Sequence, residues 1–277
     1  METIIVTTDQ SANSKSAIRF AINMARIRKA KLVVLHVYHV LRPSIWSENA
    51  YQVYKYSFVN QIRKEITVFI KKIIRSMNLS DMSFELITID HAEVTEGILE
   101  FTAQHPCDYI CISTRGAGTV KKIFGTHSSK LITHSTVPVI CIPSGYRNRP
   151  CKRVLYATDM NDYETELSRL IDFVKPFNAK LRMLHLASSN EFGADSVLAE
   201  ERIQEKLSYK VEVINREWNI SHPILKDIGA EVKRYKPSLI AFFTHQERSF
   251  LAQLVLPSNA AEYSFYGRVP MISFKKA

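Results

Sequence analysis

A glycine-rich stretch, Ser113 to Thr126, carries the residue types best suited to hold a phosphate. Its glycines are Gly116, Gly118 and Gly125. Glycine lacks a Cβ, so backbone N–H groups can approach phosphate oxygens closely. Thr126 stands where it caps the next helix, whose N-terminus carries partial positive charge, and Arg115 adds a mobile cation. The stretch predicts a phosphate site, although a flexible surface loop with a helix cap fits the same residues.

A second candidate is Asp9, which follows the first apolar run of the chain. In an open parallel sheet, ligands bind beyond the carboxyl ends of the strands. The five residues after Asp9 contain no glycine, so a dinucleotide fingerprint and a Walker P-loop are both absent here. Asp9 is therefore expected to contact a ligand without belonging to a phosphate loop.

No set of residues predicts catalysis or metal binding. Between Asp108 and Tyr146 the chain holds no Asp or Glu that could serve as a base or hold a metal near the glycines. The four cysteines lack the spacing of a metal site and lie in or beside apolar runs, which predicts reduced core thiols. They are Cys107, Cys111, Cys141 and Cys151.

Composition is that of a globular protein, with 46% hydrophobic and 23% charged residues among 277. The net charge is +10, and up to Pro150 there are 19 basic and 11 acidic residues, against 18 and 16 after it. The first half is the one suited to meet an anion. The basic side chains between Lys64 and Arg75 share a helix without interleaved aromatics, which predicts a solvated face and no nucleic acid partner.

The N-terminus shows no signal peptide, and no apolar run reaches the roughly 18 residues that a membrane helix needs. We expect a soluble, cytoplasmic protein without a membrane partner.

An internal repeat organises the chain. The run 30–37 recurs at 179–186, and 5–9 recurs at 155–159, which are offsets of 149 and 150 residues. The run 137–140 recurs at 269–272 with a shorter offset of 132. The chain is therefore a tandem duplication, with domains expected at 1–145 and 151–277 and a linker at 146–150.

Each copy alternates β-rich runs with helical periodicity, which predicts an α/β fold of two doubly wound, mainly parallel five-stranded sheets with helices on both faces. Strands are expected at 3–8, 31–37, 83–89, 108–113, 137–142, 152–158, 180–186, 210–214, 238–243 and 269–274. First-copy helices are expected at 14–29, 51–77, 92–104 and 127–135. In the second of these an apolar stripe predicts core packing: Phe58, Ile62, Ile66, Phe69, Ile70, Ile73 and Met77.

The strand ending in Thr8-Asp9, the Leu-His-Val at 35–37, the glycine-rich loop and the Val-Pro-Val at 137–139 together resemble the universal stress protein family. The resemblance covers nearly the whole chain as two copies and implies that family's Rossmann-like fold. The loop resembles the family's ATP motif, G-x2-G-x9-G-[ST], and members with the motif bind ATP or related nucleotides. The resemblance thus implies a non-catalytic stress-response protein that binds ATP or AMP.

Carried over residue by residue, the resemblance places Asp9 and Val37 near adenine and ribose, and Gly116, Gly125 and Thr126 at the phosphates. Ser113 stands in place of the first motif glycine, and the spacer is one residue short, a difference that Gly118 can absorb. With Arg115 these complete the predicted nucleotide site. The second copy has no glycine between Phe243 and Gly267, so it is read as a degenerate partner domain that keeps Asp159.

Three other functions remain open. A ligand-free interaction module fits the departures of the loop from the motif. An ATP-hydrolysing or adenylating enzyme of similar fold needs a Ser-Gly-Gly-x-Asp-Ser loop, which residues 10–14 do not provide. A response-regulator receiver needs an acceptor Asp after the third strand, where Asp90 stands, but Pro143-Ser144 replaces its lysine; Asp90 is read instead as a helix-start residue.

Expected partners are a nucleotide, the second domain of the same chain, and a second copy of the chain in a homodimer. The fifth strands, 137–142 and 269–274, are short and contain proline, which suits an edge position. In the resembled family paired domains associate through this region. We therefore expect these strands to pack against each other, which makes the chain an internal pseudo-dimer.

Overall fold

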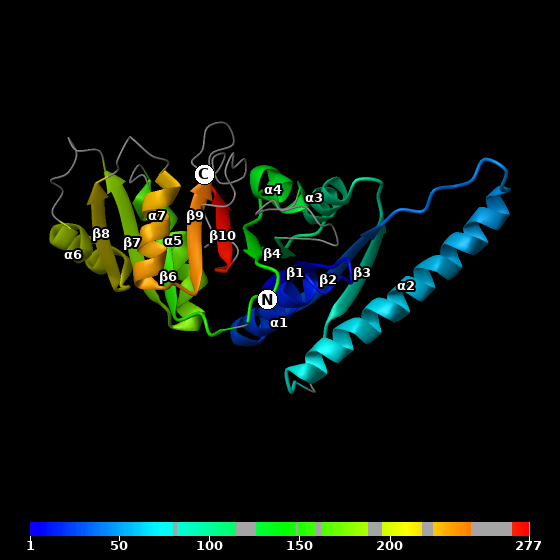
Figure 1. The fold of residues 1–277 in the computed structure, drawn as a ribbon, viewed down its shortest axis with the longest axis horizontal. Helices are drawn as coiled ribbons and strands as arrows, with labels where there is room; N and C mark the ends of the chain where they lie inside the picture. The colour runs from blue at the N-terminus through cyan, green and yellow to red at the C-terminus, as the bar shows by residue number, and fades with distance from the viewer. Residues whose placement is uncertain are drawn as a thin grey trace. The chain divides into compact units, whose positions relative to one another are not determined.

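The computed structural model describes residues 1–79, 82–114, 126–147, 149–158, 162–187, 196–217, 224–244 and 268–276 (Figure 1). These residues divide into two compact units, one ending at Gly145 and the other beginning at Tyr146. Each unit is described by itself below.

The first unit is a parallel sheet in the order β3-β2-β1-β4-β5. Its elements in chain order are β1 (Thr3–Thr7), α1 (Ser14–Arg28), β2 (Lys31–Tyr38), α2 (Glu48–Ser76), β3 (Glu85–Asp90), α3 (Val94–Gln104), β4 (Tyr109–Ser113), α4 (Thr126–His134) and β5 (Val139–Ile142). The β-branched runs of the sequence form the strands, whose ends differ from the expected ones by no more than two residues.

The second unit repeats this plan in the order β10-β9-β6-β7-β8, again with parallel pairs. Its elements are β6 (Arg153–Thr158), α5 (Tyr163–Val174), a short 3-10 helix (Lys175–Phe177), β7 (Lys180–Ala187), α6 (Ser196–Leu207), β8 (Val211–Glu217), α7 (Ile224–Tyr235), β9 (Leu239–Thr244) and β10 (Met271–Lys275). The shared strand order agrees with the duplication seen in the sequence.

The predicted α/β class is confirmed. Parallel strands joined by right-handed crossovers place helices on opposite faces when the chain changes direction along the sheet. The crossovers from β1 to β3 run one way and those from β3 to β5 run the other. Accordingly α1 contacts α2, and α3 contacts α4. In the second unit the same rule puts α7 on the face opposite α5 and α6.

The cysteines are free thiols, as expected, but only two of them lie in the core. Cys111 and Cys141 are buried in β4 and β5, and burial raises the pKa of both thiols. Cys107 and Cys151 are half-buried, which corrects the core prediction, and burial raises the pKa of each to about 11. A raised pKa favours the protonated thiol over the thiolate at neutral pH. No group of three or more His, Cys, Asp or Glu in the described ranges could hold a metal ion.

The helix α2 departs most from expectation. The predicted core stripe is wrong at four of its seven positions, because Phe58, Ile62, Phe69 and Met77 are only half-buried. The buried residues of α2 all come later or between these: Ile66, Ile70, Ile73 and Ile74. At about 1.5 Å per residue the helix is roughly twice as long as the six-residue strand β3 that it covers. Figure 1 shows its N-terminal half extending past β3.

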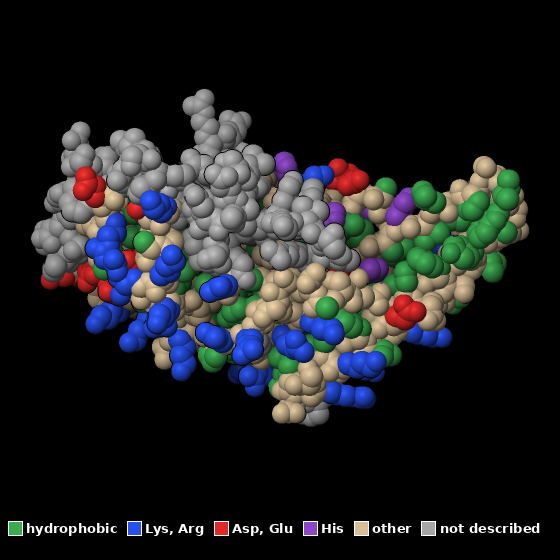
Figure 2. Space-filling model, in the orientation of Figure 1, with side chains coloured by type: hydrophobic (Ala, Val, Ile, Leu, Met, Phe, Trp, Pro, Cys, Tyr) green, Lys and Arg blue, Asp and Glu red, His purple; other side chains and the backbone are tan. Residues whose placement is uncertain are grey.

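The protruding half of α2 exposes large apolar side chains, which Figure 2 shows over that end of the helix. Val53 and Tyr56 are 71% and 73% exposed. The half-helix contacts the segment before it through polar and aromatic groups: the Tyr51 hydroxyl donates to the Val40 carbonyl at 2.9 Å, and the Trp46 and Tyr54 rings meet edge to face. Arg42 also pairs with Glu48 at the start of the helix and lies over the Tyr51 ring. Among the described residues, no helix is both long and apolar enough to cross a membrane.

We expect Gly97→Ala in α3 to lower the free energy of unfolding by about 1 kcal/mol or more, as overpacking does. A Cβ at Gly97 would lie 2.8 Å from the His91 Cβ and 3.3 Å from the Val37 Cγ1. At an ordinary helix position the change from glycine to alanine raises the free energy of unfolding, so the expected effect at Gly97 has the opposite sign. Denaturant unfolding measures it.

Ala103→Gly is the matched control, since Ala103 is exposed in the same helix. It should lose about 0.5–1 kcal/mol through helix propensity alone. A Gly97→Ala protein more stable than the parent would contradict the close approach of α3 to the end of β2.

Candidate functional site

The carboxyl edge of the first sheet is where the fold predicts a ligand, because the chain order reverses between β1 and β4. The register pairs Thr7 with Leu35 and Val6 with Cys111. Val37 and Ser113 therefore lie near the carboxyl ends of β2 and β4, on either side of β1. Asp9 lies in the turn just after β1, at the same edge of the sheet.

The turn after β1 holds Asp9 at the surface. Its Oδ1 accepts from the backbone N–H of Ser11 at 3.0 Å, which closes an Asx turn. Gln10 has φ +61°, and its N–H donates to Thr8 Oγ1 at 3.1 Å. A left-handed conformation is costly for a residue with a side chain, and such strain gathers at ligand sites.

Hydroxyl groups tie the end of β4 to the start of α1. Ser113 Oγ donates to the Asn13 carbonyl at 3.1 Å, and Thr8 Oγ1 lies 3.1 Å from Ser14 Oγ. Thr8 and Ser14 are both buried. Ser113 ends β4 with a negative φ, so a side chain is accommodated at the position that corresponds to the first motif glycine.

His36, at the end of β2, has a fixed tautomer. Its Nδ1 lies 2.8 Å from the Thr8 carbonyl, which can only accept, so Nδ1 carries the proton. In a neutral ring this leaves Nε2 as the acceptor. Its repeat partner His185 pairs instead with the Asn215 side chain, with Nδ1 3.3 Å from Oδ1, so the two copies use this histidine differently.

The rest of the predicted site falls at or beyond the limits of the described structure. Arg115, Gly116, Gly118 and Gly125 lie outside the described residues, as does Asp159 of the second copy. Thr126 is the first residue of α4, and its side chain is not described. The helix whose start was expected at His127 thus begins one residue earlier.

Sequence reasoning missed an ionic cluster at the end of β3. Asp90 accepts from Lys55 Nζ at 2.6 Å and lies 3.1 Å from His39 Nδ1. The reading of Asp90 as a helix-start residue is wrong, because the N-cap of α3 is Glu93. Burial by itself would raise the pKa of Asp90, but the hydrogen bonds from Lys55 and His39 outweigh it and lower the pKa. No local sequence signal links Lys55 to Asp90, since α2 must first fold over β3.

The carboxyl edge of the second unit carries different chemistry. Glu166 on α5 is 3% exposed, accepts from the Tyr156 hydroxyl, and has Lys276 Nζ 3.1 Å from Oε1. Arg169 donates to the Lys275 carbonyl at 2.6 Å and lies over the Phe243 ring. A pocket of about 120 Å³ opens among them, lined by Asp162, Thr165, Glu166, Arg169, Phe243 and Lys276. Charged side chains that pair with each other occupy this edge, where the first unit has hydroxyls.

Comparison with known proteins bears on both units. A model of the universal stress protein family matches residues 1–143, more than half of the chain. The chain belongs to the universal stress protein family. A search of curated proteins found no match.

Solved structures of the universal stress protein fold resemble the whole chain. A universal stress protein from Archaeoglobus fulgidus DSM 4304 is 21% identical, with a TM-score of 0.69 over 99% of this chain and 96% of that one. A protein of unknown function from Pseudomonas aeruginosa PAO1 is 14% identical, with a TM-score of 0.56 over 99% and 92%. At these identities the likeness concerns the fold.

An Archaeoglobus fulgidus universal stress protein solved in complex with dAMP is 22% identical and matches 51% of this chain and 98% of its own, with a TM-score of 0.37. The nucleotide belongs to that protein, and at this score the match carries no inference for the present chain.

We expect Lys55→Met to raise the pKa of Asp90 and to lower the free energy of unfolding at pH 7 by about 0.5–1 kcal/mol. The folded pKa of Asp90 lies below its ordinary value of 3.8. The pair therefore stabilises the fold at pH values above that and loses its effect as the pH falls through the folded pKa. The difference between parent and variant should be largest at pH 7 and should shrink as the pH falls below 3.8. NMR titration of the carboxyl and urea unfolding at pH 7 and pH 3 measure both effects.

Lys64→Met provides the control, because Lys64 is exposed on the same helix. It should leave the Asp90 titration unchanged. An unaltered Asp90 pKa in Lys55→Met would show that the pair does not persist in solution.

Proposed function

We propose that the first unit binds an adenine nucleotide, ATP or AMP, and that the protein acts in a stress response through occupancy of this site. The proposal is supported by the position of Asp9 just after β1 and of Val37 and Ser113 near the ends of β2 and β4, the strands next to β1 at the switch point. The glycine-rich sequence follows Ser113. Membership of the universal stress protein family and the match of its model to residues 1–143 agree with a site in this unit.

The described residues fit a nucleoside in chemical terms. Asp9 is exposed, and one of its carboxylate oxygens holds the turn while the other can accept from ribose hydroxyls. Val37 is half-buried and offers an apolar contact for the base. The glycines after Ser113, with Arg115 and Thr126, supply the backbone amides and the charge that phosphates need.

We infer a binding protein and not an enzyme. Cleavage of a nucleotide needs a positioned water and a base, or a metal held by carboxylates near the phosphates. The sequence between Asp108 and Tyr146 has neither Asp nor Glu, and Asp9 stands at the nucleoside end. Cationic groups that bind the ground state and transition state equally do not lower the barrier.

Gly125→Val should abolish ATP and AMP binding, because a side chain would stand where phosphate oxygens approach the amide. Asp9→Ala should weaken binding about ten-fold or more through loss of a charged acceptor. Isothermal titration calorimetry, together with native mass spectrometry of freshly purified protein, measures both.

Asp159→Ala, the corresponding change in the second copy, is the control and should leave binding unchanged. Equal losses from Asp9→Ala and Asp159→Ala would contradict the asymmetry between copies. In the same preparations the parent protein should hydrolyse ATP no faster than the Gly125→Val variant does. Sustained ATP hydrolysis by the parent that is lost in Gly125→Val would instead show that the protein is an enzyme.

A ligand-free interaction module is the second candidate, and the apolar side chains around the protruding half of α2 favour it. Leu41 and Ile45 are 78% and 89% exposed, in addition to Val53 and Tyr56. Contiguous exposed apolar surface marks interaction sites. Absence of any ATP or AMP binding by the parent protein would favour this function.

We further propose that residues 1–145 and 151–277 act as two domains of a pseudo-dimer that associate through β5 and β10. Each strand ends its own unit's strand order, and both are buried over Val139–Ile142 and Met271–Phe274. A homodimer of chains would then form through a surface other than these two edges. A crystal structure with the two strands at opposite ends of the molecule would contradict this arrangement.

A further inference from the structure

Three cations stand side by side at the amino ends of three neighbouring strands of the second unit. The register pairs Arg153 on β6 with Lys180 on β7. Lys210 directly precedes Val211, which pairs with Leu181, so Lys210 stands beside Lys180. All three side chains are exposed. Adjacent strands are about 4.8 Å apart, and like charges on neighbouring strands repel.

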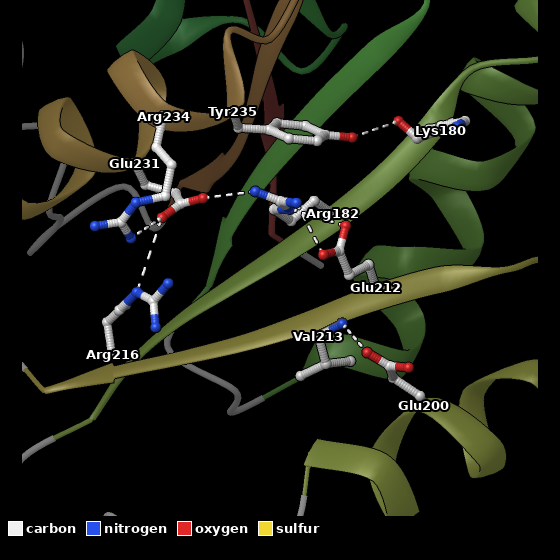
Figure 3. Close-up of polar contacts among 9 residues, drawn as sticks. All are labelled: Lys180, Arg182, Glu200, Glu212, Val213, Arg216, Glu231, Arg234 and Tyr235. Carbon is white, nitrogen blue, oxygen red and sulfur yellow. Dashed lines mark hydrogen bonds and ion pairs between the residues drawn. The ribbon is translucent and has the colours of Figure 1, made fainter.

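The three cations share the face of the sheet that α7 covers. Side chains two residues apart on a strand lie on the same face, which groups Lys180 with Arg182 and Lys210 with Glu212. Arg182 reaches Glu231 on α7, as Figure 3 shows. The Tyr235 hydroxyl at the end of α7 donates to the Lys180 carbonyl at 3.3 Å.

The end of α7 adds further exposed cations to this row. They are Lys233, Arg234 and Lys236. We call the six residues Arg153, Lys180, Lys210, Lys233, Arg234 and Lys236 the basic face. Figure 2 shows Lys and Arg side chains gathered over α7 and the strand ends beside it.

One buried carboxylate, Glu231, and one exposed carboxylate, Glu212, pair with arginines at the basic face. Glu231 is 2% exposed and lies 2.7 Å from Arg182, 3.1 Å from Arg234 and 3.8 Å from Arg216 (Figure 3). Arg182 also binds Glu212 through two hydrogen bonds and stacks 3.9 Å from the Tyr235 ring centroid. Two carboxylates thus hold three arginines, and the lysines of the face remain unneutralised by them.

Like charges on neighbouring strands repel and disfavour the isolated fold. An external polyanion would offset this repulsion.

We infer that the basic face binds the phosphate backbone of nucleic acid without reading its sequence. A row of cations about 5 Å apart is comparable with the close spacing of charges along a nucleic acid strand. Among the described residues of the second unit no large hydrophobic side chain is exposed, so this unit offers none to insert into a lipid surface. The face belongs to the second unit and does not depend on nucleotide binding by the first.

Fluorescence anisotropy with a labelled 20-base-pair DNA duplex and a labelled 20-nucleotide RNA, each titrated with the full chain, tests this proposal. Contact with about four to six phosphates predicts that Kd rises about 100-fold or more between 50 and 200 mM salt. Lys180→Glu/Lys210→Glu should weaken binding at least ten-fold and reduce the salt slope by about two.

Lys71→Glu/Lys72→Glu changes the net charge equally at exposed positions of α2 and should keep binding within about two-fold. Lys180→Gln/Lys210→Gln serves as a milder variant, expected to weaken binding with an unchanged circular dichroism spectrum. Equal loss in both glutamate variants would overturn the proposal, as would no binding by the parent. Tighter binding to anionic phospholipid vesicles than to either nucleic acid, lost in the Lys180 variants, would assign the face to a membrane surface instead.

Discussion

Strands β1 and β6 are each enclosed by a neighbouring strand on either side and by helices on both faces. Ile4, Ile5 and Val6 are at most 1% exposed, and Val154, Leu155 and Tyr156 are fully buried. Burial of each such side chain contributes about 1.5–3 kcal/mol, so the central strand is the most strongly placed part of each unit. Because the residues of the central strand are buried, polar groups can stand only where the strand ends and the chain reaches the surface. Asp9 lies at such a position, in the turn after β1.

Both units have a buried central strand, but they differ in the side chains at the carboxyl edge of the sheet. In the first unit hydroxyls of Thr8, Ser14 and Ser113 join the strand ends to α1. In the second unit Glu166 and Lys276 neutralise each other at the edge. Removal of either charge would leave the other buried without its partner, which is destabilising. A duplicated fold can thus keep its core while one copy exchanges an open polar edge for an internal ion pair.

Local patterns were sufficient for the elements built from local preferences. β-branched runs predicted every strand to within a few residues, and the repeat predicted a second sheet of the same kind as the first. The stripe on α2 failed because periodicity reports which side of a helix is apolar, while the length of the covered sheet decides how much of that side is buried. Asp90 was misread because its partner Lys55 lies 35 residues away and approaches only through packing.

The basic face is a second feature that depends on packing and that local sequence patterns do not reveal. Arg153, Lys180 and Lys210 are about 30 residues apart in sequence, so no window of the chain displays them as a cluster. Register between parallel strands is what makes them neighbours. The basic cluster that is visible in the sequence, between Lys64 and Arg75, lies along the single helix α2. Among the described residues, neighbouring strands add no comparable row of cations to it.

The overhang of α2 has a consequence for local unfolding. No residue of the helix before Ile66 is buried, and an isolated helix of that length is marginal in water. Its backbone amides should therefore exchange with solvent through local openings that leave both sheets intact. The free energy of these openings should be among the lowest in the molecule. The Ser47 cap and the aromatic contacts of Trp46 and Tyr54 set how often such openings occur. Anything that covers this half-helix would slow deuterium uptake there while leaving the rest of the chain unchanged, so the segment itself reports whether it is covered.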